Sequence, residues 1–145
     1  MSSNKPMPVQ TDISAPFWEG LKEGRVLIQH CSDCEKWTFY PRRHCSHCFS
    51  HQVEFREVSG EGVLYTYTVA RIPTLPEFAG PEPQLMAVVE LDQGVRVNTT
   101  LVGLKEDEIK IGMRVKPVRA LVSKDGTVLL RFTGVDVDLA EIDEV

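Results

Sequence analysis

The sequence predicts a mainly β protein with one short N-terminal helix, a small metal-binding ribbon and a five-stranded barrel. Two observations carry this prediction. Four cysteines form two Cys-x-x-Cys pairs between positions 31 and 48, and the chain has no other cysteine. Several later segments alternate apolar and polar residues with the period of two that is typical of strands.

The predicted helix starts after Ser14, a good capping residue, and ends at Gly24. Phe17, Trp18 and Leu21 give it an apolar stripe. The helix thus has one face that suits packing against the rest of the chain.

The two cysteine pairs predict one metal site. Four thiolates on two tight turns can surround a tetrahedral ion, and zinc is the default occupant. The predicted ligands are Cys31, Cys34, Cys45 and Cys48. The gap between the pairs is shorter than in most zinc ribbons, and Glu35 and Phe49 stand where such turns usually have glycine. Iron is the rival metal, because four thiolates also suit a rubredoxin-type electron carrier.

The ribbon itself is predicted as strand, Cys turn, strand, Cys turn. Residues 25–30 read as the first strand, and Trp37, Phe39 and Tyr40 mark an aromatic second strand that Pro41 ends. A unit of this size buries too little apolar surface to fold alone. Structural zinc contributes an apparent binding energy of about 10–16 kcal/mol in small modules, so metal should decide whether the ribbon folds. A saturated site leaves no position for water and no thiol for nucleophilic chemistry, so we predict no catalytic residue in this chain.

The second half predicts an OB-fold, a small Greek-key barrel. Its strands are expected near residues 63–70, 85–91, 95–101, 115–122 and 127–133, with a short helix at 106–109 between the third and fourth. The apolar run from Leu85 to Leu91 is expected to be covered on both faces, and Asp125-Gly126 is the best hairpin signal. A generic five-stranded barrel or sandwich would give a similar pattern.

The connection from residue 71 to 84 is long and contains four prolines, with Leu75 and Phe78 near its middle. Long loops with apolar tips often contact ligands or partners. The alternative is that Phe78 folds back onto the barrel.

Charge is concentrated at one end. Residues 135–145 contain five acidic and no basic residues, which equals the whole net charge of −5. The rest of the chain is balanced, which disfavours nucleic acid as a partner. No apolar run reaches the length of a membrane span, and residues 1–12 lack the apolar region of a secretory signal, so we expect a cytoplasmic protein.

Taken together, the motifs resemble a bacterial and archaeal family that joins a rubredoxin-like zinc ribbon to an OB-fold and was long catalogued as a domain of unknown function. The resemblance covers about residues 17–133. It is carried by these segments: Phe17-Trp18-Glu19-Gly20-Leu21, the two cysteine pairs, Tyr40-Pro41-Arg42, Gly62-Val63-Leu64-Tyr65, residues 88–96 and Ile111-Gly112-Met113-Arg114-Val115.

The resemblance implies an acyl-CoA-associated role. Members act as small, non-catalytic subunits of thiolase-like enzymes that carry out thiolysis, acyl transfer or retro-aldol cleavage. The implied partner is therefore a thiolase-like catalytic subunit in a hetero-oligomer, and CoA or acyl-CoA is a candidate ligand beside structural zinc.

Arg42, Arg43, Arg71 and Phe78 are the candidate acyl-CoA-binding residues, and Leu75 and Phe78 are the candidate partner contacts. Arginines among aromatic rings suit the phosphates and adenine of CoA. The same features suit single-stranded nucleic acid, so a nucleic-acid-binding ribbon–OB module is the alternative function. A solvated basic edge beside a small aromatic core is the structural alternative.

The predicted domain limits are a disordered or loosely docked lead-in at 1–12, the helix and ribbon at 13–57, the OB-fold at 58–135 and a solvated acidic tail at 136–145.

Overall fold

The structure is a computed structural model that describes residues 5–122 and 126–144. Asp125, one half of the predicted Asp125-Gly126 turn, lies outside the described residues. Within the described ranges, none of the helices is long and apolar enough to cross a bilayer.

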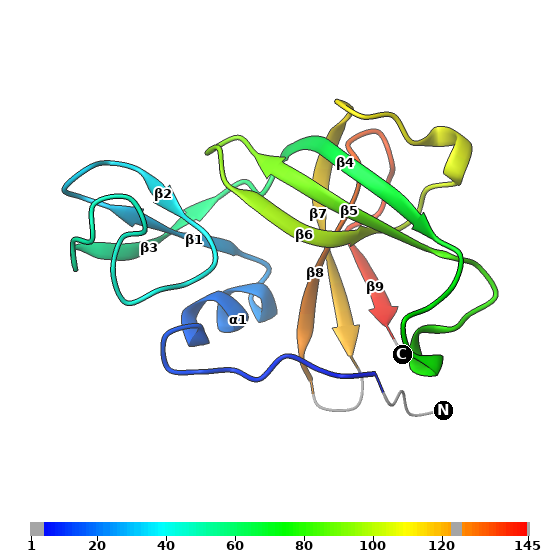
Figure 1. Cartoon of the computed structure of the whole chain (residues 1–145), viewed down its shortest axis with the longest axis horizontal. Coiled ribbons are helices and arrows are strands. Elements are labelled where there is room, and N and C mark those ends of the chain that lie inside the picture. Colours follow the sequence, from blue (N-terminus) through cyan, green and yellow to red (C-terminus); the bar gives the residue numbers. More distant parts are fainter. Residues whose placement is uncertain (1–4, 123–125, 145) are drawn as a thin grey trace.

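The N-terminal half is a helix followed by a three-stranded antiparallel sheet (Figure 1). Its elements are α1 (Ala15–Lys22), β1 (Val26–Cys31), β2 (Trp37–Thr38) and β3 (Val53–Val58). The strand order is β2-β1-β3, and every residue of the central strand β1 is buried. β1 ends at Cys31, the first predicted metal ligand, so the best-covered strand of the sheet positions the cysteine site.

Ser14 stands at the N-cap of α1, as predicted, but its side chain makes no cap bond to the helix. Instead the Thr11 amide donates to Ser14 Oγ at 2.9 Å, and the Ser14 amide donates to Thr11 Oγ1 at 3.2 Å. This reciprocal pair resembles a capping box with Ser14 in the third position. These bonds close a turn over residues 11–14 that directly precedes the helix.

The second ribbon strand is shorter than predicted, because β2 contains Trp37 and Thr38 alone. After Phe39 the chain leaves the sheet and approaches the barrel. There Tyr40 Oη accepts a hydrogen bond from the backbone amide of Asn98 at 3.1 Å. The aromatic segment thus links ribbon to barrel instead of extending the ribbon sheet.

The C-terminal half is a closed five-stranded barrel, which confirms the predicted fold. Its strands are β4 (Gly62–Ala70), β5 (Gln84–Leu91), β6 (Arg96–Leu101), β7 (Arg114–Val122) and β8 (Val128–Gly134), with 3-10 turns η1 (Pro76–Phe78) and η2 (Glu106–Glu108) between them. The order is β4-β5-β6-β8-β7, with β7 pairing back to β4. Only the β6–β8 pair in this ring is parallel.

The barrel closes through a short, tight seam. β4 and β7 pair at two positions, Gly62–Val115 and Val63–Arg114. A Cβ on Gly62 would lie 2.2 Å from the Glu90 carbonyl oxygen, so only glycine fits there. Beside this seam Arg114 donates two bonds to the Asp92 carboxylate, at 2.7 and 3.1 Å, and lowers the pKa of that group.

One strand is less covered than its sequence suggests. The run from Leu85 to Leu91 was expected to be buried on both faces, but Met86 is 48% exposed. Its neighbours in register, Thr68 on β4 and Thr100 on β6, lie on the same outer face. Ala87, Val89 and Leu91 carry the buried face.

The acidic tail is not simply a solvated end, which corrects the prediction. Residues 141–144 form β9 (Glu141–Glu144), which pairs in parallel with β7 beyond the point where β4 has turned away. Arg131 donates two bonds to Glu144, at 2.7 and 3.0 Å, and both side chains are largely buried. Strand pairing and arginines on the barrel thus offset the charge repulsion that favours a solvated tail.

Ribbon and barrel share one hydrophobic cluster. It includes Phe17 and Leu21 from α1, Ile28 from β1, and Leu130 and Phe132 from β8. Arg119 on β7 adds a polar link, donating to the Leu21 and Lys22 carbonyl oxygens at 2.9 and 2.6 Å. The helix therefore packs between the two sheets and joins them.

Candidate metal centre and adjoining groove

The four cysteine sulfurs converge on one point. All four Sγ atoms lie within 4.8 Å of one another. The Cys31–Cys48 and Cys34–Cys45 pairs are 3.7 and 3.6 Å apart. A tetrahedral zinc about 2.3 Å from each sulfur requires separations of about 3.8 Å. The predicted ligand set is therefore brought together with the spacing that zinc needs.

Both cysteine turns have the same backbone form despite lacking glycine. The Glu35 amide donates to the Cys31 carbonyl at 2.8 Å, and the Phe49 amide donates to the Cys45 carbonyl at 3.0 Å. Glu35 and Phe49 adopt φ angles of 61° and 63°, in the left-handed region that favours glycine. The turns therefore keep their usual form without glycine, and the backbone is strained at Glu35 and Phe49.

The crowding of the four sulfurs moves the pKa values of Cys45 and Cys48 in opposite directions. Burial alone would raise the pKa of Cys45, but the amides of Cys48 and His47 donate to its sulfur and lower the pKa to about 6. At Cys48 the Ser50 amide favours the thiolate, yet burial and the three neighbouring sulfurs raise the pKa to about 12. Four thiolates in one small volume repel one another, and a bound cation removes that repulsion. The residues present therefore fit a four-coordinate structural zinc.

The ligand group found within the described residues contains the four sulfurs and no histidine nitrogen. His30 is buried with its ring 4.8 Å from that of Trp37. His44 and His51 lie beside the second turn, with ring centroids 5.8 Å apart. The histidines near the site thus lie around the sulfurs and are not part of the ligand set.

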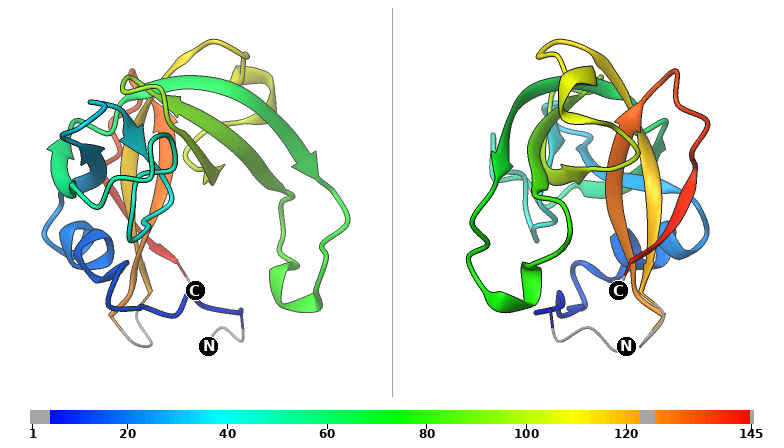
Figure 2. Two further views of the ribbon diagram at one scale, coloured as in Figure 1. Left: turned by 60° about the vertical axis from the view of Figure 1, so that its left-hand side comes forward. Right: turned by 90° about the vertical axis from the view of Figure 1, so that its right-hand side faces the viewer.

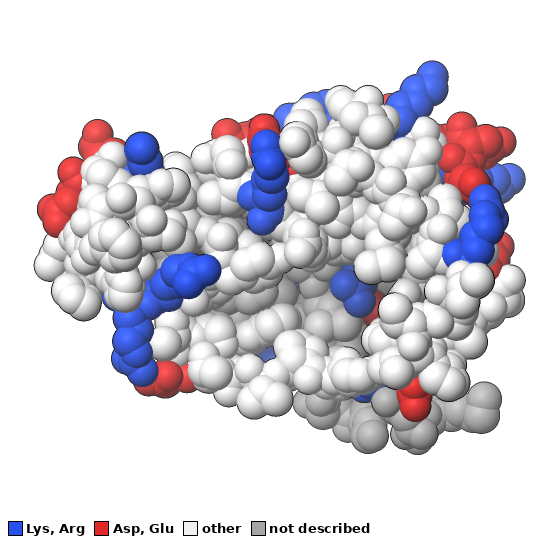
Figure 3. Space-filling model, viewed as in Figure 1, with Lys and Arg blue, Asp and Glu red and all other residues white. Residues whose placement is uncertain are grey.

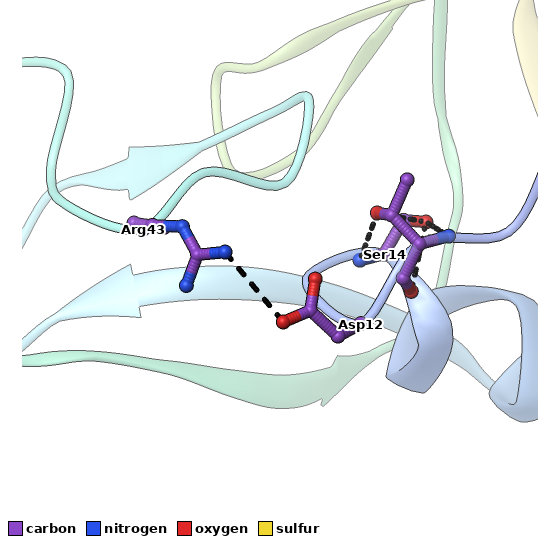
Figure 4. A network of polar contacts seen from close by, with 4 residues as sticks. Asp12, Ser14 and Arg43 are labelled. Carbon is purple, nitrogen blue, oxygen red and sulfur yellow. Dashed lines mark hydrogen bonds and ion pairs between the residues drawn. The ribbon is translucent and has the colours of Figure 1, made fainter.

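Arg42 and Arg43 directly precede the second cysteine turn. Buried Gln29 fixes the backbone there: its side-chain Nε2 donates to the Arg42 carbonyl, and its Oε1 accepts from the Arg42 amide, both at 2.8 Å. Arg43 pairs with Asp12 at 3.5 Å (Figure 4). Both arginine side chains are exposed, and both line a shallow depression of about 600 Å³.

The remaining predicted site residues lie elsewhere. Arg71, Leu75 and Phe78 belong to the loop between β4 and β5, at the end of the molecule opposite the ribbon (Figures 1 and 2). Arg71 pairs with Glu106 at 2.7 Å. Phe78 lines a hollow of about 300 Å³ formed by the loop's own residues, and Leu75 is 42% exposed. The structure therefore does not unite these residues with Arg42 and Arg43 in one site.

A groove that the sequence did not predict lies where helix, ribbon and barrel meet. It has a volume of about 390 Å³. Aromatic side chains form one side: Phe17, Trp18, Phe39 and Tyr40. Val97, Asn98, Leu129, Leu130 and Arg131 from β6 and β8 form the other. Figure 3 shows the molecule hollowed on this face, with mostly uncharged side chains around the hollow.

No periodicity signals this groove, because its walls come from segments that lie far apart in the chain. The helix stripe gave one hint, since Trp18 lies at the groove instead of being fully buried with Phe17 and Leu21. The other walls depend on the pairing of β6 with β8 and on the contact of Tyr40 with Asn98. Both are tertiary contacts, which local sequence patterns do not reveal.

Family models match most of the chain. The model of the ChsH2 rubredoxin-like zinc ribbon domain matches residues 18–54, and that of the ChsH2 C-terminal OB-fold domain matches residues 55–120. Their shared border falls within β3.

Relatives of known sequence fall into two length classes. A DUF35 domain-containing scaffold protein of Methanocaldococcus jannaschii is 33% identical over 112 residues, covering 75% of this chain and 78% of that protein. A probable enoyl-CoA hydratase alpha subunit of Thermomonospora curvata is 38% identical over 111 residues, covering 77% of this chain. The chain spans about a third of that longer subunit, 34% of its length.

Among solved structures, a chain of the Ltp2-ChsH2(DUF35) aldolase is 34% identical with a TM-score of 0.76, over 88% of this chain and 98% of that one. The two family models together match residues 18–120, and the alignment with the Methanocaldococcus jannaschii protein covers 78% of that relative. The chain therefore belongs to the family of DUF35 domain-containing scaffold proteins.

Proposed function

We propose that this chain is a non-catalytic zinc-containing subunit that supports a separate enzyme acting on acyl-CoA thioesters. The observation that carries the proposal is the match to a chain of the Ltp2-ChsH2(DUF35) aldolase, which covers 98% of that chain. The relative named as an enoyl-CoA hydratase alpha subunit adds the thioester class.

The metal site supports a scaffolding role. All four cysteines are directed at one tetrahedral position, so none is free to form a covalent thioester with substrate. A structural zinc with four protein ligands has no open coordination position. The cysteines and their zinc therefore serve folding in this proposal. Catalysis is assigned to the companion chain, which we propose is thiolase-like.

We further propose that the loop between β4 and β5 contacts the companion. Ile72 is 88% exposed and Leu75 is 42% exposed, at the end of the molecule away from the ribbon. Exposed apolar side chains on a proline-stiffened loop lose little conformational freedom on binding. Leu75 and Phe78 are the residues expected to matter most, because η1 holds them in place.

The test is purification of the tagged chain from its native host under mild conditions, followed by mass spectrometry and an acyl-CoA turnover assay. A thiolase-like companion should co-purify in stoichiometric amount, and turnover should require it. Leu75→Glu should release the companion, whereas Ile111→Glu, at a site that is 65% exposed between η2 and β7, should retain it. Turnover of an acyl-CoA by the isolated chain, or co-purification of nucleic acid in place of an enzyme, contradicts the proposal.

A further inference from the structure

We propose that the groove between α1, the ribbon and the barrel binds the apolar acyl group of a CoA thioester whose phosphates lie over Arg42 and Arg43. The coenzyme A part of this inference rests on the proposed function. The division of the site into an apolar and a basic half does not, because it follows from the residues that line the two hollows.

The groove suits an uncharged, apolar occupant. Its volume of about 390 Å³ falls within the usual range for small-molecule sites. Phe17, Trp18 and Phe39 offer ring faces and edges, and Leu129 offers an aliphatic wall. The one charged side chain in the lining, Arg131, is already paired with Glu144, so the groove presents no uncompensated charge. A charged group placed here would lose its hydration without an opposite charge in return.

The basic depression borders this groove directly. Thr11, Ser14 and Pro41 line the groove, while their chain neighbours Asp12 and Arg42 line the depression. The two hollows therefore lie on either side of the same two segments. Figure 4 shows these two segments side by side, with Arg43 and Asp12 facing each other near Ser14.

The depression suits an anion. Arg42, Arg43 and His51 line it, and Asp12 is the one acid among its lining residues. The Arg43–Asp12 pair is 3.5 Å long and its side chains are 69% and 80% exposed, so the pair is weak and phosphate can displace the carboxylate. The buried Gln29 bonds on both sides of Arg42 hold the backbone in place before any ligand arrives. A fixed backbone lowers the entropy cost of binding.

An acyl-CoA divides in the same way, with phosphates at one end and an uncharged acyl group at the other. A fatty acid shares the apolar part but has one carboxylate in place of the phosphates. Both are amphiphilic anions, so the experiment must separate the two sources.

The chain contains two tryptophans, and one of them, Trp18, lines the groove. A Trp37→Phe background therefore leaves Trp18 as the sole tryptophan reporter. The purified zinc-loaded chain is titrated with octanoyl-CoA, with CoA and with octanoate, and Trp18 emission is followed. We expect saturable binding of octanoyl-CoA, with an affinity at least about tenfold higher than that of CoA or octanoate.

Two variants separate the halves of the site. Leu129→Glu should weaken octanoyl-CoA at least about tenfold and leave CoA within about twofold, because it charges the groove alone. Arg42→Gln with Arg43→Gln should weaken octanoyl-CoA and CoA together and leave octanoate nearly unchanged. Ile111→Glu is the matched apolar-to-acid control outside both hollows. Zinc content and thermal melting verify that each variant is folded, and Leu129→Ser replaces Leu129→Glu if the latter is not.

Equal affinities for octanoyl-CoA and CoA, or full octanoyl-CoA affinity in a folded Leu129 variant, overturn the groove assignment. Octanoate binding as tightly as octanoyl-CoA overturns the assignment of the head group. These outcomes come from the isolated chain, so they are distinguishable from a failure to find a catalytic companion.

Discussion

The ribbon and the barrel are held together in different ways. In the ribbon, β1 is buried throughout, but β2 and β3 are mostly half-exposed or exposed, and the cysteine turns are joined through four sulfurs. In the barrel, buried side chains from every strand form a continuous core around Leu64, Val89 and Phe132. The ribbon thus depends on a cation and the barrel on apolar burial.

The largest expected effect comes from metal removal. Without zinc the four sulfurs repel or must take up protons, and an apparent binding energy of about 10–16 kcal/mol is lost. Chelation, or Cys45→Ser, should abolish the dispersed amide signals of β1–β3 in NMR spectra while the signals of β4–β8 persist. Ser46→Ala is the control beside the ligands. Unchanged β1–β3 signals after verified removal of zinc would show that apolar burial alone holds the ribbon.

The barrel should respond to loss of a core side chain. Phe132 is fully buried, so Phe132→Ala should cost about 3–5 kcal/mol of unfolding free energy, read from the denaturant midpoint. Met86→Ala, at a site 48% exposed on the outer face of β5, should cost less than about 1 kcal/mol. Because Phe132 and Ile28 belong to one cluster, zinc-loaded ribbon and barrel should unfold in a single transition. Two separate transitions would mean that the shared cluster does not couple the halves.

A smaller effect should appear at the two cysteine turns. Glu35→Gly and Phe49→Gly each remove a left-handed strain of about 1–2 kcal/mol and add some unfolded-state entropy. The net gain should be up to about 1 kcal/mol per site, measured by competition for zinc with a chelator and by thermal melting. Glu35→Val should act in the opposite direction. If the glycine variants bind zinc more weakly, then side-chain contacts and not backbone strain govern these positions.

The order of elements could be predicted because each rests on local pattern. The period of two predicted the barrel strands, and the barrel was confirmed. The cysteine spacing predicted a ligand set whose four sulfurs the fold brings together. Local pattern failed to predict the structure of segments whose conformation depends on contacts with distant parts of the chain. Tyr40 leaves the ribbon to bond Asn98, and residues 141–144 gain a strand partner in β7 despite their charge.

The same limit applies to the candidate ligand residues. Arg42 and Phe78 were grouped by chemistry, yet the fold places them at opposite ends of the molecule. Proximity between sequence-distant side chains depends on strand order and on loop direction, which composition does not encode. Leu129 and Trp18 face one groove for the same reason, and no motif contains both.

The Arg119 side chain is hydrogen-bonded to two other parts of the fold. Its guanidinium donates to the Leu21 and Lys22 carbonyl oxygens at the end of α1 and to Glu141 on β9, at 2.6 Å. One side chain thus spans helix, barrel and terminal strand. Separation of β9 from β7 would remove Glu141, one of the three hydrogen-bond partners that hold the guanidinium at the end of the helix. Arg119 therefore connects the acidic end of the chain to the helix that carries part of the aromatic wall of the groove.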